Sequence, residues 1–202
     1  ILAAKRGASK VYAVDIMPRA VELTLHNAQR NGVASRIEAF AGSLFEPLRN
    51  VRADLVVDDV SGIAEEAARA TPWYPPSIPS GGSDGAGPTV EMLKTAPAHL
   101  TPSGRLVFPV LSLANEQRIL AEAQRVFTEL RLRTQRLFPI PQTLQEALKR
   151  LKTCVQTGML RLVQRSSRVC WQLRVFEARL ASAPMRKGES SHDPSTTPSD
   201  QS

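Results

Sequence analysis

The sequence predicts an α/β domain in which helices pack on both faces of a doubly wound, mostly parallel sheet that antiparallel strands close. Short apolar runs alternate with stretches of helical period along the chain. Residues 11–15 form a β-branched run that ends in Asp15, and Pro18 then begins a helical pattern at once. Residues 54–58 are a continuous apolar run between acids, which is typical of a strand in the middle of a parallel sheet. Alternation of this kind implies right-handed crossovers.

The first part of the chain gives four elements. Gly7 ends a helix whose earlier turns are expected before Ile1, together with the first strand of the sheet. Asn31 and Gly32 end the next helix, whose apolar residues recur at helical spacing. The expected elements are a helix end at 1–6, a strand at 11–15, a helix at 18–31 and a strand at 36–40.

The rest of the chain continues the alternation and ends in two closing strands. The expected elements are a strand at 54–58, a helix at 63–70, a long loop at 71–88, a helix at 89–100, a turn at 101–104, a strand at 105–110, a helix at 114–130, a strand at 131–139, a helix at 142–152 and a strand at 170–180. Loops as long as 71–88 are functional or disordered, and 81–87 is expected to be a flexible turn. We therefore expect one domain over 1–182, lacking its amino-terminal part, and a disordered tail over 183–202.

Composition limits the function classes. The chain has 202 residues and no apolar run of the roughly 18 residues that a membrane span needs. Cys154 and Cys170 make no disulfide framework, so a reducing cytoplasm is expected. The three histidines are scattered, and no metal site is predicted.

The formal net charge is +7, and basic residues crowd the last third of the chain. This pattern is typical of a nucleic-acid footprint or of an arginine-rich solvated surface, and few aromatic residues interleave with the charges. The residues are Arg131, Arg133, Arg136, Lys149, Arg150, Lys152, Arg161, Arg165, Arg168 and Arg174.

Asp15 has two possible roles. A carboxylate at the carboxyl end of a parallel strand can accept hydrogen bonds from both hydroxyls of a nucleotide ribose. An aspartate before a helix can instead cap its first turn. The strand alone does not decide between them.

The ordered set of motifs resembles class I S-adenosylmethionine-dependent methyltransferases, and is most similar to the small-domain group that contains the protein-glutamine amide methyltransferases. The similarity covers about residues 1–140 and, with the last strand, most of the folded part. The residues that carry it are Ala13-Val14-Asp15, Asn27-Ala28, Asn31-Gly32-Val33, Gly42-Ser43, the run 54–59 and the run 100–106.

The resemblance implies a bound S-adenosylmethionine and a protein or small-molecule methyl acceptor. Asp15 is then expected to bind the ribose, with Ile16 packed on the adenine. Ser43 and Leu44 are expected at the adenine edge, although the family often has an acid in place of Ser43. Asp58 is expected to complete the cofactor site. The family's glycine-rich turn falls before Ile1, so the chain holds half of the cofactor cradle and is expected to be inactive by itself.

The catalytic motif departs from the family. Amide and adenine-amino methyltransferases have Asn or Asp, then Pro-Pro, then an aromatic residue, whereas this chain has Asp59, Val60, Ser61 and Gly62. The resemblance makes Asp59 the residue that accepts an acceptor N–H, and places the three following residues against the substrate. Trp73 and Tyr74 are candidates for the lost stacking face, or else anchor their loop by burying an aromatic pair.

Three alternatives remain open. A nucleic-acid methyltransferase agrees with the basic last third, and half of a nicotinamide-dependent dehydrogenase agrees with Asp15. A non-catalytic scaffold agrees with the altered motif at 59–62.

Overall fold

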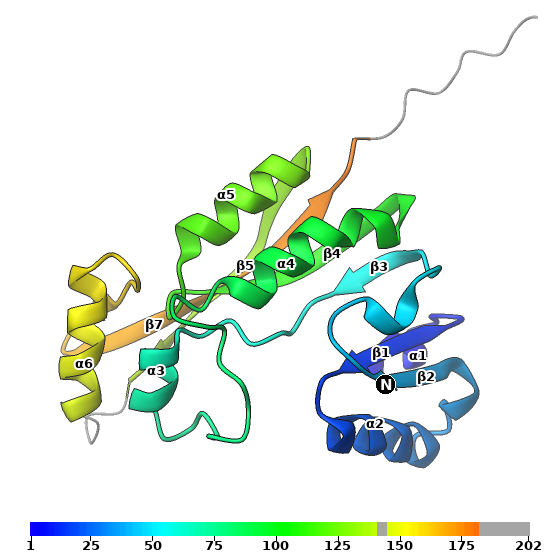
Figure 1. Ribbon diagram of the computed structural model, residues 1–202, viewed down its shortest axis with the longest axis horizontal. Helices are drawn as coiled ribbons and strands as arrows, with labels where there is room; N and C mark the ends of the chain where they lie inside the picture. The colour runs from blue at the N-terminus through cyan, green and yellow to red at the C-terminus, as the bar shows by residue number, and fades with distance from the viewer. Residues whose placement is uncertain (141–144, 182–202) are drawn as a thin grey trace, which may run out of the picture.

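The computed structural model describes residues 1–140 and 145–181 (Figure 1). Three short 3₁₀ segments, η1 (Ala34–Arg36), η2 (Glu46–Leu48) and η3 (Ala96–His99), join the larger elements. The helices and strands are α1 (Leu2–Lys5), β1 (Val11–Asp15), α2 (Pro18–Arg30), β2 (Ile37–Ala41), β3 (Ala53–Val57), α3 (Glu65–Ala70), α4 (Gly87–Thr95), β4 (Leu100–Leu111), α5 (Glu116–Val126), β5 (Glu129–Pro139), α6 (Gln145–Gln156), β6 (Val163–Arg165) and β7 (Arg168–Arg179).

The described strands form two sheets. β1 and β2 pair in parallel, with Val11 opposite Ile37. The larger sheet has the order β3-β4-β7-β5, and β6 pairs with β7. β3 and β4 are parallel, whereas β7 is antiparallel to β4, β5 and β6. The α/β class and the antiparallel closing strands are confirmed, and the sheet is mixed.

The β1–β2 sheet packs on α2 through a small core. Pro18 is the first residue of α2, where its missing N–H costs no hydrogen bond. Ala4, Ala28, Val33 and Ile37 are the buried residues of this core, with Ile1 and Val11 partly buried against them. Two of the four are alanines, so this unit buries little apolar surface.

The larger sheet has a much larger core beneath α4 and α5. Phe108 on β4 is fully buried and stacks on Phe176 of β7, with the ring centroids 5.9 Å apart. Leu106 and Val110 are also fully buried, on the same face of β4 as Phe108. Alternating residues of a strand point to one face, which explains why 106, 108 and 110 are buried beneath these helices.

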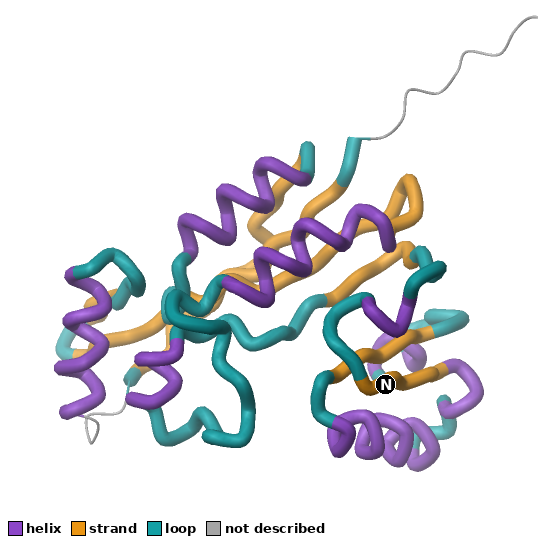
Figure 2. The backbone as a smooth tube through the Cα atoms, viewed as in Figure 1, coloured by secondary structure: helices purple, strands orange, loops and turns teal. Residues whose placement is uncertain are grey.

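A second core joins α3 and α6 at the far end of the sheet (Figure 1). Ile63, Leu113 and Leu151 are each at most 2% exposed there. Beside it, the ring of Trp171 stacks on Phe138 at 4.5 Å and on Trp73 at 5.9 Å between centroids. The connection between α3 and α4, which Figure 2 shows as a long loop, therefore rests partly on β7.

Several expectations for the elements need correction. Among the described strands β3 pairs only with β4, so it lies at a sheet edge and not in the middle, and Val57 is 66% exposed. The segment 101–104 is no separate turn, because β4 runs through it with a register shift against β3. The helix expected at 114–130 ends at Val126, since Phe127 takes an extended conformation (φ −112°, ψ 140°) and is buried in the main core.

Two further points complete the comparison. Sequence periodicity missed β6, because three residues are too few to show a period. Among the described strands β6 pairs only with β7, which follows it in the chain. The tail expected over 183–202, and residues 141–144, lie outside the described residues.

Candidate functional site

Asp15 is the last residue of β1, and its side chain shapes the turn into α2. Its Oδ1 accepts a hydrogen bond from the Met17 N–H at 2.8 Å, and its carbonyl oxygen accepts one from the Gly42 N–H at 3.1 Å. The helix-capping position is Met17, which has no side-chain cap. Asp15 therefore holds a tight turn beyond its strand, and its exposed Oδ2 has no partner among the described residues.

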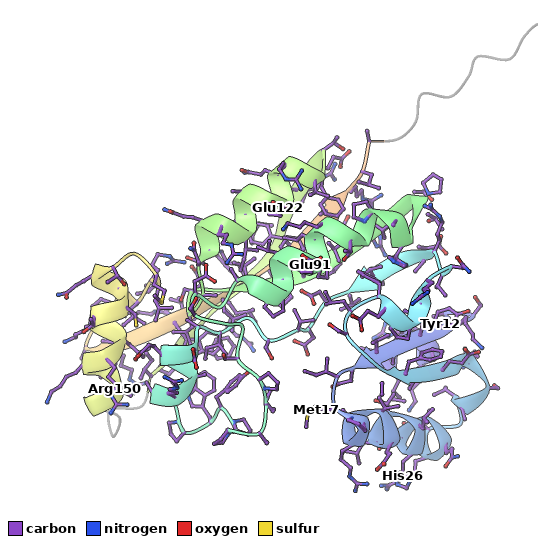
Figure 3. All side chains as sticks on the ribbon, in the orientation of Figure 1. Tyr12, Met17, His26, Glu91, Glu122 and Arg150 are labelled. Atoms are coloured by element: carbon purple, nitrogen blue, oxygen red, sulfur yellow. The ribbon has the colours of Figure 1, made fainter. Side chains whose placement is uncertain are left out.

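The residues after Asp15 present apolar surface at the same turn. Ile16 is 51% exposed, and Figure 3 places Met17 at the start of α2. An exposed isoleucine beside a carboxylate with a free oxygen suits a ligand that has a flat apolar ring and a neighbouring diol.

Ser43 and Leu44 lie in the turn after β2. The Ser43 N–H donates to Glu46 Oε2 at 3.2 Å, so a carboxylate lies beside Ser43 although the chain has none at that position. Leu44 has a left-handed backbone (φ 50°), which is uncommon outside glycine. Its side chain packs partly against the main core, which leaves only part of it for a ligand.

Asp58 directly follows β3 and is 7% exposed. Its Oδ1 accepts the Val60 N–H at 3.1 Å, and its backbone N–H donates to the Val107 carbonyl oxygen at 2.9 Å. Its Oδ2 is buried with no hydrogen-bond partner in the described structure. Burial raises the pKa of this carboxyl to about 6, and the charge of Asp59 adds to the increase.

Asp59 points into a more open environment than Asp58. Its side chain is exposed, but partial removal from water by the surrounding chain raises its pKa. Two adjacent acids with raised pKa values at one strand end are typical of functional sites.

The residues that follow connect this strand end to the long loop. The Tyr74 hydroxyl donates to the Pro79 carbonyl oxygen at 2.6 Å and is hydrogen-bonded to the Ser61 hydroxyl at 3.1 Å. Val60, Ser61 and Gly62 are all half-buried. The structure therefore places the Tyr74 hydroxyl at the altered motif, and a stacking role for its ring stays a prediction.

Trp73 lies apart from Tyr74. Its ring stacks on Trp171, and 44% of the residue is exposed. The loop is thus anchored by two aromatic side chains, Tyr74 through its hydroxyl on Ser61 and Trp73 through its stack on Trp171.

The glycine-rich part of the long loop is fixed by hydrogen bonds, which corrects the expectation of a flexible turn. The Gly81 N–H donates to the Ile63 carbonyl oxygen at 2.8 Å, and the Glu65 N–H donates to that of Gly82 at 3.0 Å. At Gly85 (φ 75°) an added Cβ would lie 2.5 Å from the Ala64 backbone nitrogen, so the close approach requires glycine.

Sequence reasoning also missed Asp84, which ties this loop to the start of α5. Its carboxylate accepts two hydrogen bonds of 3.0 Å from the Arg118 guanidinium and one of 3.1 Å from the Ala86 N–H. Its carbonyl oxygen accepts the Asn115 N–H at 2.7 Å. These contacts hold the pKa of Asp84 below its usual range despite partial burial. Asn115 before a helical run was the available signal, because it is a strong capping residue.

The candidate residues gather at the carboxyl ends of β1 and β3, whose arrowheads point the same way in Figure 1. These two strands belong to different sheets. No three His, Cys, Asp or Glu residues of the described chain come together as a metal site. No helix in the described part is long and apolar enough to cross a membrane.

The chain is similar to known methyltransferases over part of its length. The family described as ribosomal protein L11 methyltransferase (PrmA) matches residues 1–65. The ribosomal protein L11 methyltransferase of Pelotomaculum thermopropionicum is 44% identical over 75 residues, 35% of this chain and 24% of the relative. The release factor glutamine methyltransferase of Cereibacter sphaeroides is 35% identical over 114 residues, 54% of this chain and 41% of the relative.

One solved structure was also compared. The crystal structure of the ribosomal protein L11 methylase of Lactobacillus delbrueckii subsp. bulgaricus is 16% identical, with a TM-score of 0.47 over 85% of this chain and 60% of the other. The chain spans less than half the length of the two curated relatives. The resemblance to class I S-adenosylmethionine-dependent methyltransferases of the protein-methylating group is confirmed.

Proposed function

We propose that this chain forms the cofactor-binding and acceptor-binding edge of an S-adenosylmethionine-dependent methyltransferase that modifies a protein side-chain nitrogen. One observation supports it most. Asp15 ends β1 and Asp58 directly follows β3, and each of these strands belongs to a parallel pair. Each of the two carboxylates keeps one oxygen without a partner among the described residues. Ligands of open α/β sheets bind outside the carboxyl ends of the strands.

The residues after β1 suit the cofactor. Asp15 Oδ2 is free and Oδ1 is already held by Met17, so the carboxylate is oriented before a ligand arrives. We assign the ribose to Asp15 and the adenine to Ile16, with Ser43 and the exposed part of Leu44 at its edge. Asp58 is assigned to the cofactor side through its buried Oδ2.

The residues after β3 suit the acceptor. The bound cofactor supplies an electrophilic methyl group on a sulfonium. Transfer would break the sulfur–carbon bond, form a nitrogen–carbon bond and leave S-adenosylhomocysteine, and the proton of the acceptor nitrogen would pass to the Asp59 carboxylate. We assign Asp59 to accept the N–H of that nitrogen, which keeps its lone pair directed at the methyl group. Partial burial raises the pKa of Asp59, and a higher pKa makes the carboxylate a better proton acceptor.

The acceptor class follows from the relatives' names and from the loop at 60–62. The relatives are named for ribosomal protein L11 and for release factor glutamine, so a protein amide or amine is the acceptor proposed here. Tyr74, hydrogen-bonded to Ser61, is assigned as the aromatic side chain of this motif, which lacks the family's own aromatic residue. Trp73 is an end ring of the stack that it forms with Trp171 and Phe138, and we assign it to contact the incoming acceptor.

Cofactor binding is tested by thermal unfolding of the intact protein with S-adenosylhomocysteine or NAD. A ligand at about 100 times its Kd stabilises by about 2.7 kcal/mol, so S-adenosylhomocysteine should raise the Tm while NAD should not. Asp15→Asn should abolish the increase. The matched control is Asp54→Asn, near the opposite end of β3, where the side chain accepts from Thr101 and asparagine keeps an acceptor oxygen. Equal responses of the two variants contradict the assignment.

Acceptor chemistry is tested by transfer of a radiolabelled methyl group to bacterial ribosomal proteins and release factors. Asp59→Ala removes the acceptor oxygen, and should keep S-adenosylhomocysteine binding and lose transfer by about 100-fold or more. Transfer at the wild-type rate by this variant would remove Asp59 from the reaction. Binding of the cofactor without transfer to any acceptor by the wild type would support a non-catalytic scaffold.

A further inference from the structure

A two-stranded ribbon extends from one end of the larger sheet. β6 and β7 form a tight hairpin in which Arg165 faces Arg168, with Ser166 and Ser167 at its tip. Ser166 has φ 52°, as tight hairpin turns require. β4 ends at Leu111, opposite Leu173, so the preceding residues of β7 extend past β4.

The register of the strands places the ribbon beyond the ends of β4 and β5. β5 and β4 are both antiparallel to β7, and β5 ends with Pro139 opposite Cys170, beside the hairpin. β3 ends earlier, because Val57 is opposite Val107 and Val107 is opposite Glu177, near the end of β7. The hairpin is therefore a surface separate from the two acids that follow β3.

A pocket of about 310 Å³ lies between the hairpin and the end of β5. The residues lining it contribute two guanidinium groups and two serine hydroxyls, and include neither a carboxylate nor an aromatic ring. They are Leu137, Pro139, Arg165, Ser166, Ser167, Arg168 and Cys170. Small-ligand sites begin at roughly 300 Å³, so the pocket suits a single small charged unit.

Unlike Arg131, Arg161 and Arg174, the pocket arginines have no acidic partner among the described residues. Arg161 and Arg174 both pair with Glu116 at 2.8 Å. Arg131 pairs with Glu129 at 2.9 Å. Arg165 and Arg168 are exposed and face each other across the hairpin. Two like charges held opposite each other repel and destabilise the hairpin. An anion bound between the two guanidinium groups offsets this repulsion.

We propose that the β6–β7 hairpin binds the phosphodiester backbone of a nucleic acid at this pocket. Guanidinium forks and serine hydroxyls donate to phosphate oxygens. The absence of aromatic lining predicts contact with the backbone and no stacking of bases. A polyanion is favoured over a single carboxylate because Arg136 on β5 and Arg150 on α6 also have no acidic partner among the described residues, and the whole chain has a net charge of +7. Figure 3 shows Arg150 on α6, at the same end of the molecule.

The test is fluorescence anisotropy of the intact protein with labelled single-stranded RNA, and with DNA of the same length, without cofactor or acceptor. The double variant Arg165→Gln/Arg168→Gln should weaken binding about tenfold and reduce the slope of log K against log salt by about one to two. Ser167→Glu places a carboxylate at the tip and should weaken binding at least as much. Both variants change exposed residues, and their Tm should match that of the wild type.

The matched control is Arg30→Gln/Arg125→Gln, which removes the same charge at the ends of α2 and α5. Equal loss in this control would show that only net charge matters and would overturn the site. Unchanged binding in the hairpin variants would also overturn it, as would tighter binding of poly-glutamate than of either nucleic acid. A preference between RNA and DNA identifies the source of the phosphate. S-adenosylhomocysteine binding is measured separately, so failure here leaves the proposed methyl transfer standing.

Discussion

The two sheets carry the two halves of the candidate site, and the hydrophobic cores beneath them differ greatly in size. The β1–β2 sheet presents Asp15 but rests on a core of Ala4, Ala28, Val33 and Ile37. The larger sheet presents Asp58 and Asp59 and has Phe108, Leu106 and many other buried side chains beneath it. Burial of apolar surface is the main favourable contribution to folding. The cofactor side is therefore the weaker side, and ligand binding should stabilise it most.

The largest expected effect comes from the main core. Phe108→Ala removes a fully buried ring that stacks on Phe176 and should lower the free energy of unfolding by about 3–5 kcal/mol. Urea denaturation followed by circular dichroism measures this. A loss below about 1 kcal/mol would mean that the larger sheet does not dominate stability.

The next effect depends on pH and belongs to Asp58. In the unfolded chain this carboxyl ionises near its ordinary value of 3.8, whereas in the folded protein its pKa is about 6. Between these values the folded state binds more protons, so stability falls as pH rises and the full cost is present above about pH 7. The shift corresponds to about 3 kcal/mol.

Asp58→Asn removes this cost while keeping an oxygen for the Val60 N–H. The variant should be more stable than the wild type by about 1–3 kcal/mol near pH 8 and indistinguishable from it near pH 3. Urea denaturation at both pH values checks this. A pH-independent difference would show that Asp58 is not buried in its charged form.

A matched pair of smaller changes compares the sheets directly. Ile37→Val and Ile119→Val each delete one buried methylene and should each cost about 0.5–1.5 kcal/mol. Amide hydrogen exchange should speed up only within about the first 50 residues for Ile37→Val, because the small unit opens alone. For Ile119→Val the slowest amides of β4 and β7 should change. The same exchange pattern in both variants would mean that the two sheets unfold together.

The smallest effect tests a surface ion pair of the weaker unit. Arg19 lies 2.7 Å from Glu22 on α2, with both side chains mostly exposed. Arg19→Ala should change stability by less than about 0.5 kcal/mol. A Tm measurement in low and high salt checks it, and a loss above about 1 kcal/mol would show that α2 depends on its surface charges.

Local pattern predicted the elements with strong periodicity. The strand at 11–15 and the helix starting at Pro18 were predicted to the residue or nearly so. Each depends on neighbours in sequence, through β-branched residues, Pro18 and the Asn31-Gly32 stop. The placement of Asp15 and of Asp58 and Asp59 at strand ends followed from the same pattern.

Long-range contacts were beyond such reasoning. Asp84 is fixed by Arg118 from a distant helix, and Tyr74 reaches Ser61 across thirteen positions. Neither contact has a periodic signature. The edge position of β3 was also hidden, because a run of apolar residues does not show how many partners a strand has. The binding roles of the site residues stay predictions.

The free edge of β3 has a consequence for handling the protein. Leu55 and Val57 are 42% and 66% exposed, and the backbone groups along that side of the strand meet no other described strand. Edges of this kind template intermolecular β-pairing. Concentrated solutions should therefore form oligomers through this strand, and a charged residue in place of Val57 is the simplest way to keep the molecules apart.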